Sequence, residues 1–110
     1  MNTILRTAKI TPKKKGLFVL LYKRVVNGPI IPYDSSDLFD SFTVHIEKSG
    51  HIGHFIFPKK ALEEHGIISV NGIGGKRAIR VYPPWEMVES KQAKWTQQWQ
   101  RPYYHSLLSV

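Results

Sequence analysis

Two β-rich runs joined by a tight turn constrain the fold of this chain more than any other feature of its sequence. Residues 42–48 and 51–57 are rich in aromatic and β-branched side chains, and only Ser49 and Gly50 separate them. A two-residue connection of this kind predicts a β-hairpin, whose aromatic face must turn inward. With a turn of two residues, three pairs of side chains are expected to lie opposite each other across the hairpin: Phe42 with Phe57, Val44 with Phe55, and His45 with His54.

The rest of the chain shows the patterns of further strands and two helices. Alternating polarity predicts a strand over residues 4–10, and an apolar run predicts a strand over residues 17–22 that is covered on both faces. A leading proline and a trailing glycine predict a short helix over residues 59–65. A second helix is predicted over residues 86–100, after a short cationic strand that stops at Pro83. This order favours an α+β fold, with a small mixed or antiparallel sheet and two helices packed on it.

Length and composition limit the classes of protein to which the chain can belong. With 110 residues, it is expected to form one domain over residues 1–110 with a single modest core. It contains no cysteine, which excludes disulfides and thiolate metal sites and fits a reducing cytoplasm. No apolar run approaches the ~20 residues that cross a bilayer, and the first residues form no signal-peptide core. We therefore expect a cytoplasmic protein with no membrane partner, while its oligomeric state stays open.

The chain is strongly basic. Lysine and arginine number 16 against 8 aspartates and glutamates, which gives a net charge of +8 and a pI near 9.9. Nucleic-acid-binding proteins have such values, although a basic surface also suits anionic membranes or keeps a protein in solution. Asp34, Asp37 and Asp40 fall in a loop predicted over residues 33–41, where such side chains hydrogen-bond to nearby backbone. The charge therefore predicts an anionic partner, and nucleic acid is favoured.

The cationic strand indicates where such a partner would bind. Arg77 and Arg80 point to opposite faces of a strand, and a guanidinium can fork onto a phosphate. Pro83 and Pro84 cannot donate to a sheet ladder, so the strand must end at an edge or a rim. The candidate contacts are Lys76, Arg77 and Arg80 at the centre, Lys14, Lys59, Lys60 and Lys91 as outlying phosphate contacts, and Trp85 as a ring that stacks on bases.

Two further pairs of residues allow more than one interpretation. Trp95 and Trp99 could stack on unpaired bases if they were exposed, but they are four residues apart, which favours a stripe of the second helix that is buried in the core. Arg6 and Lys9 lie on an otherwise covered strand, where a charged residue is either part of a site or a buried ion-pair partner.

Catalytic chemistry finds weaker support. A nuclease with a restriction-endonuclease core needs an acidic residue and an acid-x-Lys motif on adjacent strands to hold Mg²⁺. The only Glu-x-Lys motif in the sequence is Glu89-Ser90-Lys91. It falls at the start of a predicted helix, whereas the nuclease motif must lie on a strand. His45 and His54, with Glu47 nearby, are interpreted as polar-face residues in preference to a zinc or general-base site. Residues 72–76 are glycine-rich but do not match a P-loop. No cofactor, metal or catalytic residue is expected.

Several blocks of residues spread along the chain form a recognisable set. They are Arg6-Thr7-Ala8-Lys9-Ile10-Thr11-Pro12 with Lys14, Gly16, Phe18 and Val19, the pair Lys23-Arg24, Gly53-x-Phe55-x-Phe57-Pro58-Lys59, the cationic strand, and Gln92-Ala93-x-x-Thr96-Gln97-x-Trp99-Gln100. Together they resemble the MepB family, bacterial proteins named for their place beside a multidrug efflux gene. The resemblance spans nearly the whole chain.

The resemblance implies a compact α/β or α+β domain similar to the core of restriction endonucleases, with nucleic-acid binding as its function. Members of the family carry a further segment ahead of the Arg6 block, which this chain is expected to lack, and Leu17 stands where a glutamine is expected. Three functions stay open. The favoured one is a non-catalytic domain that binds DNA or RNA mainly through its phosphates. The alternatives are a divergent metal-dependent nuclease and a protein-interaction module linked to drug-response regulation.

Overall fold

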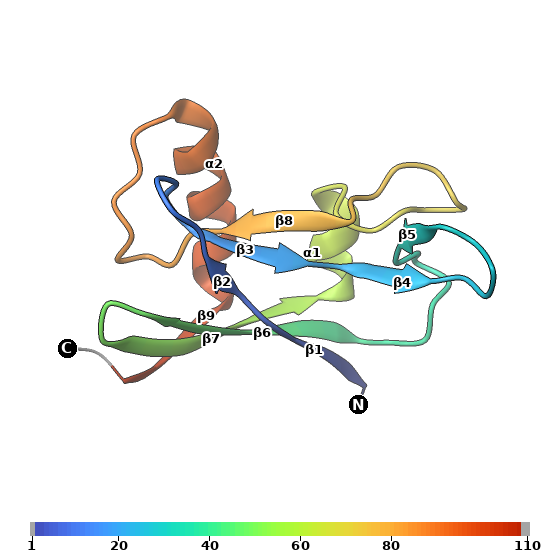
Figure 1. The fold of residues 1–110 in the computed structure, drawn as a ribbon, viewed down its shortest axis with the longest axis horizontal. Helices are drawn as coiled ribbons and strands as arrows, with labels where there is room; N and C mark the ends of the chain where they lie inside the picture. The colour runs from blue at the N-terminus through green and yellow to red at the C-terminus, as the bar shows by residue number, and fades with distance from the viewer. Residues whose placement is uncertain (1, 109–110) are drawn as a thin grey trace.

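The chain folds into the α+β arrangement that the order of its elements predicts (Figure 1). The computed structural model describes residues 2–108, and within that range no helix is long and apolar enough to cross a membrane. The helices are α1 (Lys59–Glu64) and α2 (Lys91–Gln100), followed by a 3₁₀ turn, η1 (Arg101–Tyr103). The strands are β1 (Thr3–Thr7), β2 (Lys9–Ile10), β3 (Leu17–Leu20), β4 (Tyr22–Arg24), β5 (Ile30–Pro32), β6 (Ser41–Lys48), β7 (His51–Pro58), β8 (Ala78–Val81) and β9 (Tyr104–Leu108).

The strands are distributed over two main sheets and a short ribbon. One sheet has the order β1-β6-β7-β9, a second has the order β2-β3-β8, and β4 pairs with β5. The β1–β6 pair is parallel, whereas the other strand pairs of the described residues are antiparallel. In Figure 1 the three-stranded sheet lies above the four-stranded one, and both helices lie behind β3.

The predicted N-terminal strand is divided between the two sheets. β1 pairs with β6, whereas β2 pairs with β3. Ala8 is buried at the division, and its N–H donates to the His45 carbonyl at 2.9 Å. The strand predicted over residues 17–22 divides in the same way at Leu21, where β3 gives way to β4. These divisions let both sheets turn an apolar face to one core.

The predicted hairpin is formed by β6 and β7, and all three predicted side-chain pairs lie opposite each other. Phe42, Phe55 and Phe57 are completely buried, so the aromatic face turns inward as expected. Leu17 and Val19 complete this core from the three-stranded sheet. Burial of each of these side chains stabilises the fold by about 1.5–3 kcal/mol relative to exposure.

A strand that the sequence analysis did not predict extends the four-stranded sheet. β9 follows soon after Pro102 and pairs with β7, with Tyr104 opposite Phe55. The Tyr104 ring crosses the backbone of Gly53, where any side chain would collide with the phenol. A glycine inside β7 therefore provides the room that this ring needs.

The buried side chains of α2 are those of Gln97 and Gln100, and of the two tryptophans only Trp99 packs against the core. Trp99 packs on Phe57 with 5.6 Å between the ring centres, but Trp95 is 59% exposed, so the prediction of a buried Trp95 is wrong. Gln97 and Gln100 are buried in its place. The helix also begins later than predicted, because the side chain of the preceding serine accepts a backbone N–H at 3.1 Å and caps it.

The two buried glutamines close the outer edge of β8. Gln100 Oε1 accepts from the Tyr82 N–H at 2.8 Å, and Gln100 Nε2 donates to the Arg80 carbonyl at 3.0 Å. One side-chain amide thus hydrogen-bonds to β8 as a neighbouring strand would. Gln97 Nε2 donates to the carbonyls of Pro83 and Glu86, both at 2.8 Å. The polar motif of α2 therefore has a structural role.

Replacing Gln100 by leucine is expected to destabilise the fold by about 1–3 kcal/mol, because the Tyr82 N–H and the Arg80 carbonyl lose their partner. Urea unfolding followed by circular dichroism measures this loss. The matched control is Gln98→Leu, which changes an exposed glutamine of the same helix. Equal unfolding midpoints for the two variants would contradict the role given to Gln100.

Candidate nucleic-acid interface

The outer face of the three-stranded sheet carries a row of half-exposed apolar side chains. Along β3, Leu17 and Val19 point into the core, whereas Phe18 and Leu20 point outward. Tyr22 continues this outward row on β4. Both helices pack behind the sheet, so the row faces solvent, and the prediction that this segment is covered on both faces is wrong (Figure 1). We call Phe18, Leu20 and Tyr22 the apolar row.

Cations flank the Phe18 ring on both neighbouring strands. Lys9 of β2, Phe18 of β3 and Arg80 of β8 lie opposite one another in the sheet register. The Arg80 guanidinium lies 6.0 Å from the centre of the Phe18 ring, and Lys9 is exposed. Side chains that are opposite each other in a sheet share one face, so ring and charges are presented together.

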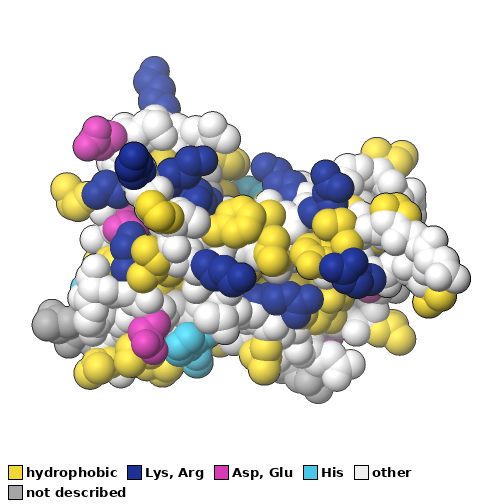
Figure 2. Space-filling model, viewed as in Figure 1, with side chains coloured by type: hydrophobic (Ala, Val, Ile, Leu, Met, Phe, Trp, Pro, Cys, Tyr) yellow, Lys and Arg dark blue, Asp and Glu magenta, His cyan; other side chains and the backbone are white. Residues whose placement is uncertain are grey.

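Two more arginines complete this arrangement around the apolar row. The Arg24 guanidinium lies 5.7 Å from the centre of the Tyr22 ring. Arg6 and Lys9 line a shallow hollow of about 360 Å³ together with the apolar row. Figure 2 shows this face, with lysines and arginines on both sides of a hydrophobic band. We call Arg6, Lys9, Arg24 and Arg80 the cation frame.

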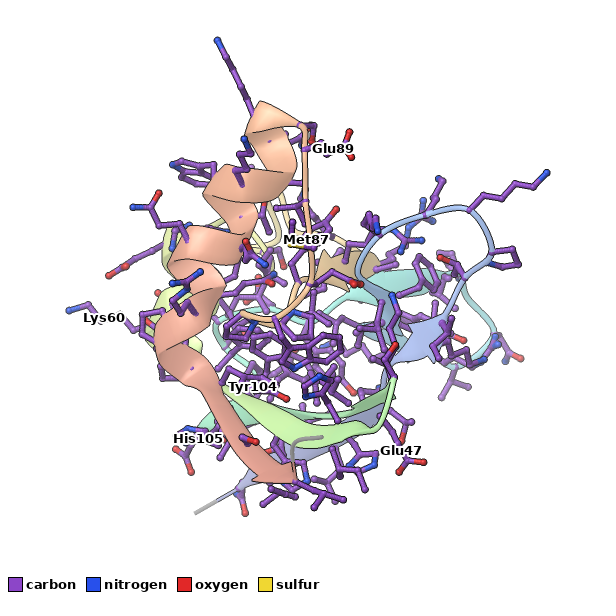
Figure 3. All side chains as sticks on the ribbon, turned by 90° about the vertical axis from the view of Figure 1, so that its left-hand side faces the viewer. Glu47, Lys60, Met87, Glu89, Tyr104 and His105 are labelled. Atoms are coloured by element: carbon purple, nitrogen blue, oxygen red, sulfur yellow. The ribbon has the colours of Figure 1, made fainter. Side chains whose placement is uncertain are left out.

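Arg80 also holds a lysine-rich turn beside the apolar row. Its guanidinium donates to the Lys15 carbonyl at 3.0 Å and to Thr11 Oγ1 at 2.8 Å. Gly16 follows with φ +74°, and a side chain there would meet the Tyr82 ring at 2.7 Å. In Figure 3 this turn lies to the right of α2, and Lys14 and Lys15 line a hollow together with Ser90 and Ala93 at the start of that helix. The lysine turn presents three exposed cations: Lys13, Lys14 and Lys15.

Few of the cations are paired with a carboxylate. Of the 16 lysines and arginines, only Lys23 and Lys48 form such an ion pair within the part of the chain that the structure describes. Lys23 pairs with Asp37, and Lys48 with the largely buried Glu86, both at 2.5 Å. Among the described residues, no carboxylate therefore neutralises a cation of the frame or the lysine turn. Arg6 donates to the Leu5 carbonyl at 2.9 Å and to Tyr33 Oη at 3.1 Å, but these neutral partners leave its positive charge in place.

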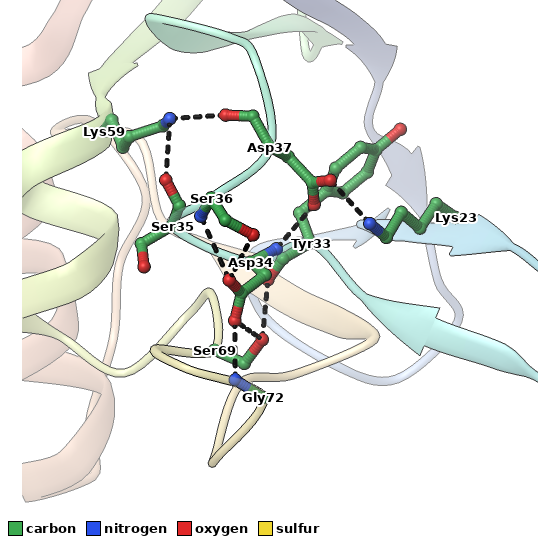
Figure 4. A network of polar contacts seen from close by, with 9 residues as sticks. All are labelled: Lys23, Tyr33, Asp34, Ser35, Ser36, Asp37, Lys59, Ser69 and Gly72. Carbon is green, nitrogen blue, oxygen red and sulfur yellow. Dashed lines mark hydrogen bonds and ion pairs between the residues drawn. The ribbon is translucent and has the colours of Figure 1, made fainter.

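The carboxylate of Asp34, in the loop before β6, accepts four hydrogen bonds within the protein (Figure 4). Its Oδ1 accepts from Ser69 Oγ at 2.7 Å and from the Gly72 N–H at 2.9 Å. Its Oδ2 accepts from the N–H of Ser36 at 3.0 Å and from the Ser36 hydroxyl at 2.7 Å. These bonds, that from Ser69 foremost, hold the pKa of Asp34 far below its ordinary value. The predicted use of loop aspartates as backbone acceptors is confirmed.

Asp37 links the same loop to two lysines. Burial raises the pKa of Asp37, but hydrogen bonds from Lys23 and from the Asp34 N–H outweigh burial and leave that pKa lowered. Lys59 Nζ donates to the Asp37 carbonyl at 2.6 Å and to the Ser35 carbonyl at 3.1 Å. Because its ammonium group is used inside the protein, we remove Lys59 from the candidate phosphate contacts.

Two other predicted contacts lie away from the apolar row. Trp85 is partly buried, donates from Nε1 to Tyr104 Oη at 3.1 Å, and stacks on His51 with 4.2 Å between ring centres. Because the Trp85 ring packs against the core and on His51, we remove Trp85 from the candidate stacking rings. Lys60 is exposed, but it projects from α1 on the side away from β2 and β3 (Figure 3).

The remaining predicted cations border other parts of the surface. Arg77 is exposed just before β8, and its carbonyl accepts from the Leu21 N–H at 2.9 Å. Lys76 lines a cavity of about 320 Å³ between α1, α2 and β8, together with Trp95. Lys91 is exposed in the first turn of α2. The predicted set therefore divides among several surfaces. Arg80 is its member beside the apolar row, and Lys14 lies in the turn to which Arg80 bonds.

The histidine pair and the Glu-x-Lys motif lie outside this face. The rings of His45 and His54 are 5.4 Å apart, and His45 Nε2 lies 3.5 Å from Glu47. Among residues 2–108, no three histidines or acidic residues come together as metal ligands. The motif at residues 89–91 marks the start of α2, where its central serine is the cap.

Sequence reasoning did not place Phe18 or Tyr22 in the candidate site, although Tyr22 is one of the aromatic residues that lie among the charges in the sequence. Both belong to a run that is apolar at every position, which is the pattern of a strand buried on both faces. The signal that would have found them is the placement of Lys9 and Arg24 on the strands that flank and extend this run. Cations at such positions indicate that one face is open.

Asp34→Asn is expected to lower the melting temperature at neutral pH, because an amide N–H₂ replaces Oδ2 and faces the N–H donor of Ser36. The folded pKa lies below the ordinary value of about 3.9, so the carboxylate stabilises the fold above about pH 4 and this stabilisation is lost as pH falls further. The difference in melting temperature between the two proteins should therefore become smaller as pH falls from about 4 to about 2. The control is Glu63→Gln on the exposed side of α1. A constant difference across this range would contradict the assignment.

Comparisons with known proteins agree with the blocks of residues found in the sequence. The MepB-like family matches residues 1–106. The crystal structure of MepB is similar to this chain with a TM-score of 0.89 and 34% identity, over 96% of this chain and 71% of that one. No curated protein matches the chain. The expected likeness to restriction endonucleases stays a prediction. With nearly its full length matched in sequence and in fold, the chain belongs to the MepB-like family.

Proposed function

We propose that this protein binds nucleic acid without catalysis, mainly through the phosphate backbone, and that the cation frame and the lysine turn are its contact surface. One observation carries the proposal. Cations that are far apart in the sequence gather around the apolar row, and one of them, Arg80, bonds to the adjoining lysine turn. None of the cations in the frame or the turn is paired with a carboxylate among the described residues.

The arrangement of these cations suits a chain of phosphates. They come from β1, β2, the lysine turn, β4 and β8, so they form an extended surface and not a single point. Each phosphate that a lysine or arginine neutralises releases counterions, and many such contacts add up to a strong, salt-dependent affinity. Binding through phosphates in this way is independent of base sequence.

The cations of the contact surface differ in how many hydrogen bonds they form within the protein. Arg80 is held by its bonds to Thr11 and to the Lys15 carbonyl, so it positions the turn as well as contributing charge. Lys9 and Arg24 are exposed at the strand ends. Contacts between such exposed cations and phosphates carry no information about the base sequence, which supports binding to DNA or RNA without sequence preference.

No observation favours either alternative function, the metal-dependent nuclease or the protein-interaction module. The Glu-x-Lys motif of the nuclease hypothesis lies at a helix start, and nothing indicates an acidic protein partner in preference to a nucleic acid. The absence of cysteine from the sequence supports placing the proposed activity in a reducing cytoplasm.

Reversing two free cations of the frame tests the proposal. Lys9→Glu with Arg24→Glu should weaken retention of a labelled oligonucleotide at low salt and lower the slope of log affinity against log salt concentration by about two, one for each lost phosphate contact. Arg80 is left unchanged, because its replacement would also release the lysine turn. Fluorescence anisotropy over a salt series measures both effects.

A matched control places the same charge change on the helices. Lys60→Glu with Lys94→Glu alters two exposed lysines of α1 and α2 by the same total charge. This variant should bind with nearly the affinity and salt dependence of the unmodified protein. Equal loss in both double variants would mean that net charge and not this face governs binding.

A further inference from the structure

We infer that the apolar row is a stacking platform for unpaired bases, so that the protein binds single-stranded nucleic acid in preference to a duplex. The inference rests on the proposed function and adds the strandedness of its ligand. It starts from the centre of the interface, where the cation frame surrounds the three side chains of the apolar row, and Thr7 is the one other described residue that lines the hollow.

The rings of the apolar row are placed where a ligand can reach them. Phe18 and Tyr22 are only partly buried, and Leu20 between them is 37% exposed. All three line the shallow hollow that Arg6 and Lys9 also border. Large apolar side chains that stay together at the surface mark an interaction site more often than single ones do.

Each ring has a cation of its own. Phe18 lies between Lys9 and Arg80 in the sheet register, and Tyr22 lies beside Arg24. A nucleotide offers a flat base and a phosphate, which are the two chemical groups that a ring and a neighbouring cation bind. The pairing of ring with charge therefore occurs twice along the same face.

The spacing of the two rings suits two separate bases. Phe18 and Tyr22 are four positions apart in the sequence, and four steps of extended chain span about 13 Å. Arg24 and Arg80 lie 5.7 and 6.0 Å from the ring centres, at the outer limit of a cation–π contact. At this distance the guanidinium groups do not cover the rings closely, so each ring keeps a face for a base.

A duplex cannot use such a platform. Its bases are already stacked on one another, and their flat faces are closed to side chains, whereas the bases of a single strand can turn outward. A duplex would engage the cation frame alone. An acidic protein is the other chemistry that an apolar row with a cationic border fits, and the experiment below includes it as an outcome.

The test compares an oligothymidylate with a duplex that has the same number of phosphates. In Phe18→Leu with Tyr22→Leu, the apolar surface stays but the rings are lost, and affinity for the oligothymidylate should fall by about 5- to 150-fold for each base that loses its ring. Affinity for the duplex should not change. The matched variant Phe18→Tyr with Tyr22→Phe keeps both rings and should bind as the unmodified protein does. Melting temperatures confirm that all variants fold.

The outcomes separate this inference from the proposed function. If the leucine variant binds both probes as the unmodified protein does, the stacking platform is refuted while phosphate binding stands. If the unmodified protein binds neither probe at low salt, the proposed function itself fails. If polyglutamate competes with the oligothymidylate at equal charge concentration, the face recognises acidic chains in general, and the inference is overturned.

Discussion

Hydrogen bonding along both edges of β8 is the constraint on which the rest of the structure depends. β3 pairs with one edge, and the Gln100 amide bonds to the other. Gln97 holds the turn that follows β8 through the carbonyls of Pro83 and Glu86. Since these glutamines fix α2 behind the sheet, the opposite face is left without a covering element (Figure 1). The candidate site is thus a consequence of where the helix is anchored.

The surface is positive because acidic side chains form contacts within the protein, whereas most lysines and arginines have no carboxylate partner among the described residues. Asp34 and Asp37 are satisfied by loop N–H groups, hydroxyls and one lysine, and Glu86 is satisfied by Lys48 and the Gly16 N–H. These acidic groups stabilise loops, and they are not placed against the cation frame. A net charge is a property of the whole chain, but a charged face depends on which side chains find partners within the fold.

The lysines show how tertiary contacts divide residues that look alike in the sequence. Lys59 is held by carbonyls of the acidic loop, whereas its neighbour Lys60 is exposed. Lys48 is paired within the fold, and Lys14 is exposed in a turn that a distant arginine stabilises. A cluster of positive residues in a sequence therefore indicates candidate phosphate contacts. Contacts with segments far away in the chain decide which of these residues can bind a phosphate.

Local patterns by themselves determined the hairpin, the short helix, the acidic loop and the basic character of this chain. The residues that specify these features are neighbours, or are joined by a turn of two residues, so their geometry follows from backbone chemistry. Only the tertiary structure decided that Phe18 and Tyr22 face solvent and that Trp85 and Lys59 bond to other parts of the protein. It also decided that the Gln100 amide hydrogen-bonds to the edge of β8 that has no neighbouring strand. Each of these outcomes depends on contacts between segments far apart in the chain, and no local pattern encodes which side of an apolar strand a remote helix will cover.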